Sequence, residues 1–346
     1  MNVAIINEST KHSGLGRYAI DLAKASSGSL FSLSLDSSID QSKYPGEVVP
    51  YRPFLKIGNG WYINHRFPSI FLRNIKTFIK DEVAPDTIIH YSSQGIPHLN
   101  MKNRYLYTIH DLFGMDLKYN GDSKLRKLLE INLKHIASSE TIVTVSQYVK
   151  SQLQNFGLNG EINVIYPPVS SSFQSLDDRV SLRKYLGLPE TKKLVLSVSS
   201  LDPRKNIKAV TGTMELLGEE YSLVRIGKPL GDCYSFSNID DEKLNMIYNA
   251  CDVLLFPSFD EGFGYPVAEA MTVGLPVVAS DIPVFHEIAE NAAFLVDPVP
   301  EKLVIGVKDA INNSDTFREH GIQKAERYSF DRFKEGINSL YKQIMA

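Results

Sequence analysis

The sequence is poor in the residues that cross-link a chain or hold a metal ion. It has two cysteines in 346 residues, Cys233 and Cys251, and their separation fits neither a disulfide framework nor a zinc site. Cys251 precedes an apolar stretch, which favours a thiol packed in the core. We therefore expect no disulfide and no bound metal.

Long apolar runs are also absent from the sequence. None approaches the roughly 20 residues that a membrane-spanning helix needs, and the opening residues MNVAIIN are typical of a strand rather than of a signal peptide. The net charge of −3 leaves no basic excess for binding nucleic acid. These absences predict a cytoplasmic globular protein that does not bind nucleic acid.

Apolar runs typical of strands alternate with amphipathic helical stretches along the chain, and this alternation predicts a parallel α/β architecture. The expected strands lie near residues 2–7, 87–91, 105–109, 141–144, 162–165, 194–198, 222–226, 252–256, 275–279 and 293–296. The expected helices lie near residues 15–25, 69–82, 122–137, 146–156, 178–186, 206–217, 240–250, 266–273 and 300–312.

A chain of this length is long enough for two domains of ordinary size. The stretch YPPVSSSF, residues 166–173, interrupts the helical and strand periodicity with two prolines and three serines, which is typical of a linker. We predict a first domain over residues 1–167, a second over 168–328, and an amphipathic helix over 329–346.

The most informative segment is DEGFGYPVAEAMTVGLPVVAS, which runs from Asp260 to Ser280. Glu261 and Glu269 flank a tight Gly-Phe-Gly-Tyr-Pro turn. Pro266 suits the first turn of a helix, and Gly274 suits its end. Apolar stretches on both sides predict a strand–turn–helix–strand unit, with the turn at the carboxyl edge of a parallel sheet. Open α/β sheets bind their ligands at that edge.

The turn and its two carboxylates suit a phosphorylated sugar ligand. Backbone N–H groups around Phe263, Gly264 and Tyr265 attract phosphate together with the helix N-terminus. A carboxylate accepts two hydrogen bonds from vicinal hydroxyls, so Glu261 suits one sugar and Glu269 another. The alternative is that both acids only favour the helix dipole. The phosphate turn and the flanking strands favour the binding site.

This segment resembles the E-x7-E motif of the family 4 glycosyltransferases, which are retaining enzymes of the GT-B fold. The resemblance extends over nearly the whole chain and implies two Rossmann-like parallel-sheet domains that face each other across a cleft. It implies that the first domain binds the acceptor, that the second binds the nucleotide-sugar donor, and that the last helix crosses back to the first domain. It also implies that Glu261 contacts the donor sugar and Glu269 the ribose. Tyr265 stands where many members have leucine.

A second segment, SVSSLDPRKNI at residues 197–207, follows an expected strand. Arg204 and Lys205 are adjacent cations there, and Asn206 suits the cap of the next helix. The two cations are either simply solvated or bind an anion, and the resemblance implies that they neutralise the donor diphosphate. The chain has no Asp-x-Asp sequence of the kind found in metal-dependent transferases, so we expect the site to work without a metal.

His110 and Asp111 follow the strand expected near residues 105–109. A lone histidine is usually structural, and Asp111 by itself suits a helix cap. The resemblance implies instead that His110 lies beneath the donor sugar, beside its reacting carbon, and that Asp111 orients nearby groups.

The stretch GLGRYA, residues 14–19, fits the G-x-G-x-x-A pattern of a dinucleotide-binding dehydrogenase. The intervening stretch from Asn7 to Ser13 is too long for the tight turn of that motif. The resemblance implies a glycine-rich loop over the donor phosphates, in which Gly16 lets the backbone approach them.

The stretch between Gly227 and Leu244 is shorter than in many family members, which place an extra helix and strand there, near the nucleotide base. Ile239 is a candidate base contact in this short stretch.

Residues 61–80 combine aromatic side chains with Arg66, Arg73, Lys76 and Lys80 and contain no acid. This composition favours a helix that packs its apolar side and keeps its cations in water. The alternative is peripheral contact with an anionic membrane or a lipid-linked acceptor.

We interpret the chain as a retaining hexosyltransferase that moves a sugar from a nucleotide diphosphate to an acceptor hydroxyl in glycan, polysaccharide or glycolipid synthesis, with no cofactor. The sequences L-D-P-R-K-N and E-G-F-G-Y-P are similar to mannosyl- and rhamnosyl-type members and favour GDP-mannose, with UDP-sugars left open. Three alternatives remain on the same fold: a sugar-nucleotide epimerase, a phosphorylase with pyridoxal phosphate, and a non-catalytic nucleotide-sugar binding module.

Overall fold

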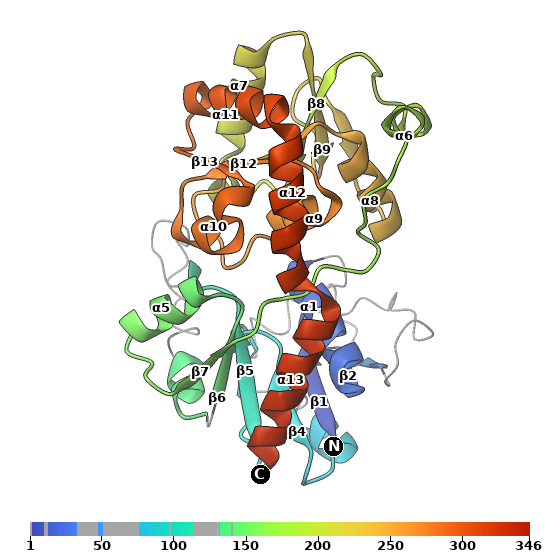
Figure 1. Cartoon of the computed structure of the whole chain (residues 1–346). Coiled ribbons are helices and arrows are strands. Elements are labelled where there is room, and N and C mark those ends of the chain that lie inside the picture. Colours follow the sequence, from blue (N-terminus) through green and yellow to red (C-terminus); the bar gives the residue numbers. More distant parts are fainter. Residues whose placement is uncertain are drawn as a thin grey trace. The chain divides into compact units, whose positions relative to one another are not determined.

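The protein folds into two compact α/β units, shown in a computed structural model (Figure 1). The structure describes residues 2–9, 13–32, 48–50, 76–96, 98–113, 130, 132–139 and 141–346. Unit 1 comprises residues 1–167 together with Asp331–Ala346, and unit 2 comprises Pro168–Phe330.

Unit 1 is built on a seven-stranded parallel sheet with the strand order β3-β2-β1-β4-β5-β6-β7. The strands are β1 (Val3–Asn7), β2 (Ser29–Ser32), β3 (Val48–Pro50), β4 (Ile88–Tyr91), β5 (Tyr105–Ile109), β6 (Thr141–Thr144) and β7 (Glu161–Val164). All five residues of β1 are buried, as expected for a strand covered on both faces.

Three helices of unit 1 are described in full: α1 (Gly14–Ser26), α5 (Gln147–Asn155) and α13 (Phe330–Met345). Residues 76–82 and 132–137 are also helical. Ser13 caps α1 by accepting a hydrogen bond from Gly16 N–H at 3.0 Å. Lys24 lies in the last turn of α1, where its charge suits the helix dipole.

The C-terminal helix α13 packs on unit 1, although the chain passes through all of unit 2 before reaching it (Figure 1). Its apolar side chains recur at helical spacing and are buried: Phe333, Ile337, Leu340, Tyr341 and Ile344. The Phe333 ring meets the Tyr18 ring of α1 edge-on, with centroids 5.6 Å apart. Asn338 Nδ2 donates to the carbonyl of Ala25 at 3.0 Å and so caps the end of α1.

Unit 2 is built on a six-stranded parallel sheet with the order β10-β9-β8-β11-β12-β13. The strands are β8 (Lys193–Val198), β9 (Tyr221–Ile226), β10 (Tyr234–Phe236), β11 (Val253–Phe256), β12 (Val277–Ser280) and β13 (Phe294–Val296). The helices are α6 (Arg179–Leu186), η3 (Pro203–Lys205), α7 (Ile207–Leu217), α8 (Asp241–Ala250), α9 (Tyr265–Val273), α10 (Pro283–Ile288), η4 (Glu290–Ala292), α11 (Pro300–Asn312), α12 (Ser314–Ala325) and η5 (Glu326–Tyr328).

Helices cover both faces of the unit 2 sheet (Figure 1). On one face, Val195, Leu255 and Val278 pack with residues of α7 and α11 in a single buried cluster. Their sequence neighbours, such as Leu196 and Leu254, point to the opposite face and are equally buried. The strands of this sheet therefore read as continuous apolar runs rather than as alternating ones.

The order of the strands creates a switch point beside β8. After β8 the chain adds β9 and then β10 on one side, and it returns to add β11 on the other. Connections that leave β8 and β11 in opposite directions open a crevice at their carboxyl ends, where open α/β sheets bind ligands.

The connection between β9 and β10 contains no helix. It consists of Gly227–Cys233 only, although parallel neighbours usually need a crossover of a dozen or more residues. Gly227 begins this turn with φ +129°, and its N–H donates to the carbonyl of Phe236 at 3.0 Å. The stretch after Gly227, which is short in the sequence, therefore forms a turn without the helix that many family members place there.

The expected parallel α/β class and two Rossmann-like sheets are present. The strands β2, β3 and β10 were not expected, because each is only three or four residues long and carries little periodicity. No helix among the described residues is long and apolar enough to cross a membrane. Most of the basic aromatic segment, residues 61–75, lies outside the described residues, and its final part belongs to the helical stretch 76–82.

Candidate active site

An ion pair joins the ends of the two central strands of unit 2. Lys205 ends η3, which follows β8, and Glu261 lies in the turn that follows β11. Because β8 and β11 are hydrogen-bonded neighbours, their carboxyl ends bring Lys205 Nζ to 2.5 Å from Glu261 Oε1. Both side chains are largely buried, at 18% and 10% exposure, and Lys205 also lies over the Phe256 ring. The contact is a charge-assisted hydrogen bond, which is shorter and stronger than one between neutral groups.

The neighbouring cation, Arg204, also contacts a carboxylate. Its Nε and Nη2 donate to the two oxygens of Asp202 at 3.1 and 2.9 Å. Burial disfavours the charge on Asp202, but hydrogen bonds from Arg204 outweigh this and lower the pKa of the carboxyl. Both predicted phosphate-binding cations are therefore engaged by acids within unit 2.

Asn206 does not cap α7 with its side chain, and this expectation was wrong. Its backbone is left-handed, with φ +49°, whereas a capping residue typically has an extended backbone. Its Nδ2 donates instead to the carbonyl of Pro298 at 2.9 Å. Asn206 thereby ties the loop after β8 to the loop after β13.

The turn before α9 is shaped by a glycine that no other residue replaces easily. Gly264 has φ +96°, and a Cβ atom there would lie 2.7 Å from the Phe285 ring. Tyr265 begins the helix and Pro266 occupies its first turn, while Gly274 ends it with φ +73°.

Phe263 packs against residues on both sides of this turn through its aromatic ring. It is buried, and its ring meets those of Tyr265 and Tyr328 edge-on, with centroids 5.4 and 5.3 Å apart.

Glu269 is held inside α9. Only 2% of it is exposed, and the hydroxyl of Tyr248 donates to Glu269 Oε2 at 2.7 Å. The carboxylate lies one turn into the helix, as the spacing predicted, and Tyr248 from α8 fixes its orientation.

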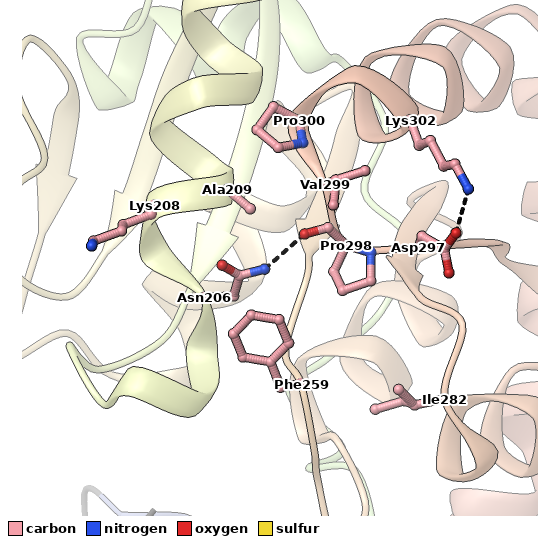
Figure 2. Close-up of a pocket in the computed structure, with 10 residues that line it drawn as sticks. All are labelled: Asn206, Lys208, Ala209, Phe259, Ile282, Asp297, Pro298, Val299, Pro300 and Lys302. Carbon is pink, nitrogen blue, oxygen red and sulfur yellow. Dashed lines mark hydrogen bonds and ion pairs between the residues drawn. The ribbon is translucent and has the colours of Figure 1, made fainter. Parts of the chain in front are cut away.

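A hollow of about 820 Å³ is lined by residues from the loops that follow β8, β11, β12 and β13 (Figure 2). Phe259 is one of these residues, and its N–H donates to the carbonyl of Arg204 at 2.8 Å. The Asn206–Pro298 hydrogen bond and the Lys302–Asp297 contact each join two lining residues. The lining consists of Asn206, Lys208, Ala209, Phe259, Ile282, Asp297, Pro298, Val299, Pro300 and Lys302.

His110 follows β5 in unit 1 and is buried in its neutral form. Its Nε2 lies 2.8 Å from the carbonyl of Ser92, which can only accept, so Nε2 carries the proton and Nδ1 is left as an acceptor. Burial lowers the pKa of His110 to about 4. Gln94 Oε1 accepts from the backbone N–H of His110 at 3.1 Å, and the Tyr18 ring meets the imidazole edge-on.

Asp111 holds its own loop. Its Oδ1 accepts from Phe113 N–H at 3.2 Å and from Gln94 Nε2 at 3.3 Å, so Gln94 contacts both His110 and Asp111.

Gly16 lies in the first helical turn of α1 rather than in a loop, and its N–H already donates to Ser13. Ile239 is half-buried just after β10, at the same carboxyl edge as Glu261.

A buried polar chain that the sequence did not reveal connects α13 to the strands below His110. Tyr341 OH lies 2.6 Å from His90 Nδ1, and His90 Nε2 lies 2.8 Å from Thr108 Oγ1. Thr108 Oγ1 in turn lies 3.1 Å from Tyr18 OH. Burial, and then the nearby His110, lower the pKa of His90 to about 3. His90 sits within an apolar strand, which is why no motif marked it.

The predicted residues thus fall into two groups. Unit 2 brings together the side chains of Arg204, Lys205, Glu261 and the turn before α9, and unit 1 places Gly16, His110 and Asp111. Within the described part of the chain, no three His, Cys, Asp or Glu residues are grouped so as to hold a metal ion.

The fold belongs to the GT-B class. The structure resembles a sucrose-phosphate synthase from Thermosynechococcus elongatus, with a TM-score of 0.79, 20% identity, and coverage of 99% of this chain and 98% of that one. It also resembles Anabaena HepE in complex with UDP-glucose, with a TM-score of 0.77, 16% identity, and coverage of 99% and 100%.

Two family models match the chain in succession. The model described as Glycosyltransferase Family 4 matches residues 12–173, and the model described as Glycosyl transferases group 1 matches residues 178–328. The chain belongs to the family 4-like glycosyltransferases.

Curated relatives act in glycan synthesis. The O-antigen chain mannosyltransferase RfbU of Salmonella typhimurium is 28% identical over 262 residues, which is 67% of each chain. The O-antigen chain mannosyltransferase B of Escherichia coli is 24% identical over 291 residues, 75% of each chain. The protein is therefore a glycosyltransferase of glycan synthesis.

Proposed function

We propose that the protein is a retaining hexosyltransferase that moves mannose from GDP-mannose to a hydroxyl of a glycan acceptor. The observation that carries this proposal is the Lys205–Glu261 pair beside the Gly264 turn, at the switch point of the unit 2 sheet. The pair places a cation that can bind phosphate, Lys205, in direct contact with a carboxylate that can accept hydrogen bonds from sugar hydroxyls, Glu261.

In this proposal the donor diphosphate binds Arg204, Lys205 and the backbone N–H groups of Phe263 to Tyr265. Asp202 and Glu261 hold the two cations in place before the donor arrives. When the Lys205 ammonium donates to phosphate oxygens instead of to Glu261, the Glu261 carboxylate can accept hydrogen bonds from the sugar hydroxyls.

The ribose and the base bind further along the same edge. Glu269, oriented by Tyr248, accepts from the ribose hydroxyls, and Ile239 packs on the base. The bare turn from Gly227 to Cys233 leaves less protein around the base than an intervening helix would supply.

The chemical step breaks the bond between the sugar C1 and the leaving phosphate oxygen and forms one between C1 and the acceptor oxygen on the same face. The acceptor proton passes to an oxygen of the departing diphosphate, so no protein base is required. His110, neutral at physiological pH, lies near the reacting carbon in this proposal, and Asp111 orients its loop. Arg204 and Lys205 stabilise the negative charge that develops on the departing diphosphate. In metal-dependent transferases a metal ion supplies this stabilisation.

The names of the relatives support mannose as the sugar, since several are mannosyltransferases. The UDP-glucose complex of a structural neighbour keeps a UDP-sugar as the second candidate. The O-antigen relatives support a glycan acceptor. In this proposal unit 1 binds that acceptor, as the resemblance to the family implies. Location in the cytoplasm and membrane contact through residues 61–80 stay predictions from the sequence.

A thermal-shift panel with GDP, UDP, ADP and dTDP tests the donor first. A ligand that binds only the folded protein raises the melting temperature, by an amount that grows with its concentration over Kd. We expect GDP to give the largest rise, with and without EDTA. A rise that requires added divalent metal would contradict the metal-free site, and no rise with any diphosphate would contradict the donor site itself.

A turnover assay then separates the enzyme classes. With GDP-mannose and an α-mannose oligosaccharide, a retaining transferase gives GDP and an α-linked product by NMR. An epimerase converts the donor without acceptor, a phosphorylase shows the absorbance of pyridoxal phosphate, and a binding module releases no GDP. Each of these last three results would replace the proposal.

A further inference from the structure

Arg225 is a buried cation that the sequence motifs did not single out. It lies in β9, one residue before the strand ends, and its relative exposure is 0%. Nη1 donates to the carbonyl and hydroxyl of Ser197, each at 3.2 Å, and Nη2 donates to the carbonyl of Ser199 at 2.5 Å and that of Ser200 at 3.5 Å. Its Nε has no hydrogen-bond partner among the described residues.

The other buried or half-buried cations named above are matched by acids, and Arg225 is not. Arg204 contacts Asp202, Lys205 contacts Glu261, and the buried Arg183 contacts Asp252 at 2.7 Å. No ion pair within the described residues joins Arg225 to a carboxylate. A guanidinium stays protonated in proteins, and a buried charge without an opposite charge is costly. The charge therefore calls for an anion that the described residues do not supply.

Two of the carbonyls that accept from Arg225, those of Ser199 and Ser200, belong to the loop that carries the phosphate-binding candidates, and the third, that of Ser197, lies near the end of β8. This loop, Ser199–Asn206, connects β8 to α7 and contains Arg204 and Lys205. Its first residue is pressed against the end of β9, since a Cβ atom on Gly227 would lie 2.5 Å from the carbonyl oxygen of Ser199. Arg225 thus fixes the base of the Ser199–Asn206 loop from beneath.

We propose that Arg225 is a positioning residue for the donor diphosphate: it anchors the Ser199–Asn206 loop, and its unmatched charge is balanced when the diphosphate binds. This inference rests on the proposed function, because the anion it assigns is the diphosphate of the nucleotide sugar. Removing the guanidinium should weaken the binding of the diphosphate and leave the binding of the nucleoside alone unchanged.

The test compares GDP with guanosine, and UDP with uridine, by calorimetry on the full chain. For Arg225→Met we expect diphosphate affinity to fall about tenfold, since a lost charge-assisted interaction is of that order, while nucleoside affinity stays within about twofold. Arg225→Lys keeps the charge but not the fork of donors, so we expect a smaller loss in the same direction.

Arg183→Met is the matched control, because Arg183 is another buried arginine of unit 2, with 6% exposure, and it already has an acid partner. We expect it to lower the melting temperature without changing the ratio of diphosphate to nucleoside affinity.

The outcomes separate the inference from the function on which it rests. If the wild-type chain binds GDP or UDP and Arg225→Met keeps the same affinity ratio, the role of Arg225 is wrong and the proposed function stands. If the wild-type chain binds neither diphosphate, both are wrong. If Arg225→Met does not fold, Arg225→Lys decides, and an unchanged ratio in that variant overturns the inference.

Discussion

At the scale of single residues, the candidate site of unit 2 depends on acids that pre-order its cations. Lys205 and Glu261 hold each other at 2.5 Å, and Arg204 is held by Asp202. The sequence motifs predicted the cations and Glu261 as separate contacts to phosphate and sugar. Their mutual pairing was not predicted, because it depends on β8 and β11 being adjacent although more than 50 residues separate Lys205 from Glu261.

The first prediction concerns the charge of Glu261. Glu261→Gln keeps the shape of the side chain but removes the negative charge, so we expect the transfer rate to fall by about 100-fold or more. We also expect a loss of about 1–3 kcal/mol in the free energy of unfolding, since Lys205 is left largely buried without its partner. Steady-state kinetics and urea unfolding measure the two effects.

Asp281→Asn is the control for this experiment. Asp281 lies after β12 and contacts His286, and both side chains are at least half exposed. We expect near-normal transfer and stability from that variant. Turnover at the wild-type rate in Glu261→Gln would remove Glu261 from the mechanism.

At the scale of elements, α9 is set between two left-handed glycines. Gly264 and Gly274 both have positive φ, and Pro266 lies in the first turn. The sequence predicted these ends because Pro and Gly act through local backbone geometry, which needs no tertiary contact. It did not predict that the Phe285 ring packs against Gly264, because Phe285 belongs to the separate helix α10.

The second prediction separates these two constraints on Gly264. Gly264→Ala meets both the positive φ and the Phe285 ring at 2.7 Å, whereas Gly187→Ala meets a left-handed φ of +67° with no atom within 4 Å. We expect Gly187→Ala to cost about 1 kcal/mol and Gly264→Ala to cost about 1–3 kcal/mol more, with weaker nucleotide binding. Urea unfolding and the thermal shift with GDP check this, and equal costs would show that the ring moves aside freely.

The short turn between β9 and β10 shows that the sequence pattern did not predict strand β10. The shortage of residues between Gly227 and Leu244 was visible in the sequence, but the three-residue strand β10 was not. Its pairing with β9 is maintained by backbone hydrogen bonds such as Gly227 N–H to Phe236, which carry no side-chain signature.

At the scale of the whole molecule, the two units differ in how strongly buried histidines make their stability depend on pH. Unit 1 buries His90 and His110 in neutral form, with pKa values lowered to about 3 and about 4. Of the described histidines of unit 2, His286 is exposed and His320 is half-buried. Within the described residues, proton uptake by fully buried histidines on unfolding is therefore a property of unit 1.

The third prediction follows from the sign of this difference. Above the ordinary histidine pKa of about 6.5, neither folded nor unfolded chain is protonated at these sites, and the full stability is present. As the pH falls from about 6.5 toward 4, the unfolded chain takes up protons that the folded unit cannot, so the free energy of unfolding of unit 1 falls. At pH 5 we expect a loss of about 2 kcal/mol for each buried histidine.

Hydrogen exchange at pH 7 and pH 5, corrected for the intrinsic rates, measures this effect unit by unit. Amides of β1, β4 and β5 should lose protection at pH 5, and those of β8 and β11 serve as the internal control. An equal loss in both units would contradict the assignment to His90 and His110.

The sequence by itself determined the parallel α/β class, the ends of α9, and the residue types at the candidate site of unit 2. These features arise from local periodicity, from the backbone preferences of Gly and Pro, and from short motifs, all of which are properties of neighbouring residues. The tertiary structure alone decided which acid holds which cation, that Arg225 has no acid partner among the residues whose placement is described, and that His90 joins Tyr341 of the C-terminal helix. These depend on strand order and on packing between residues far apart in the chain, where burial makes the cost of an unmatched charge or an unpaired polar group large enough to matter.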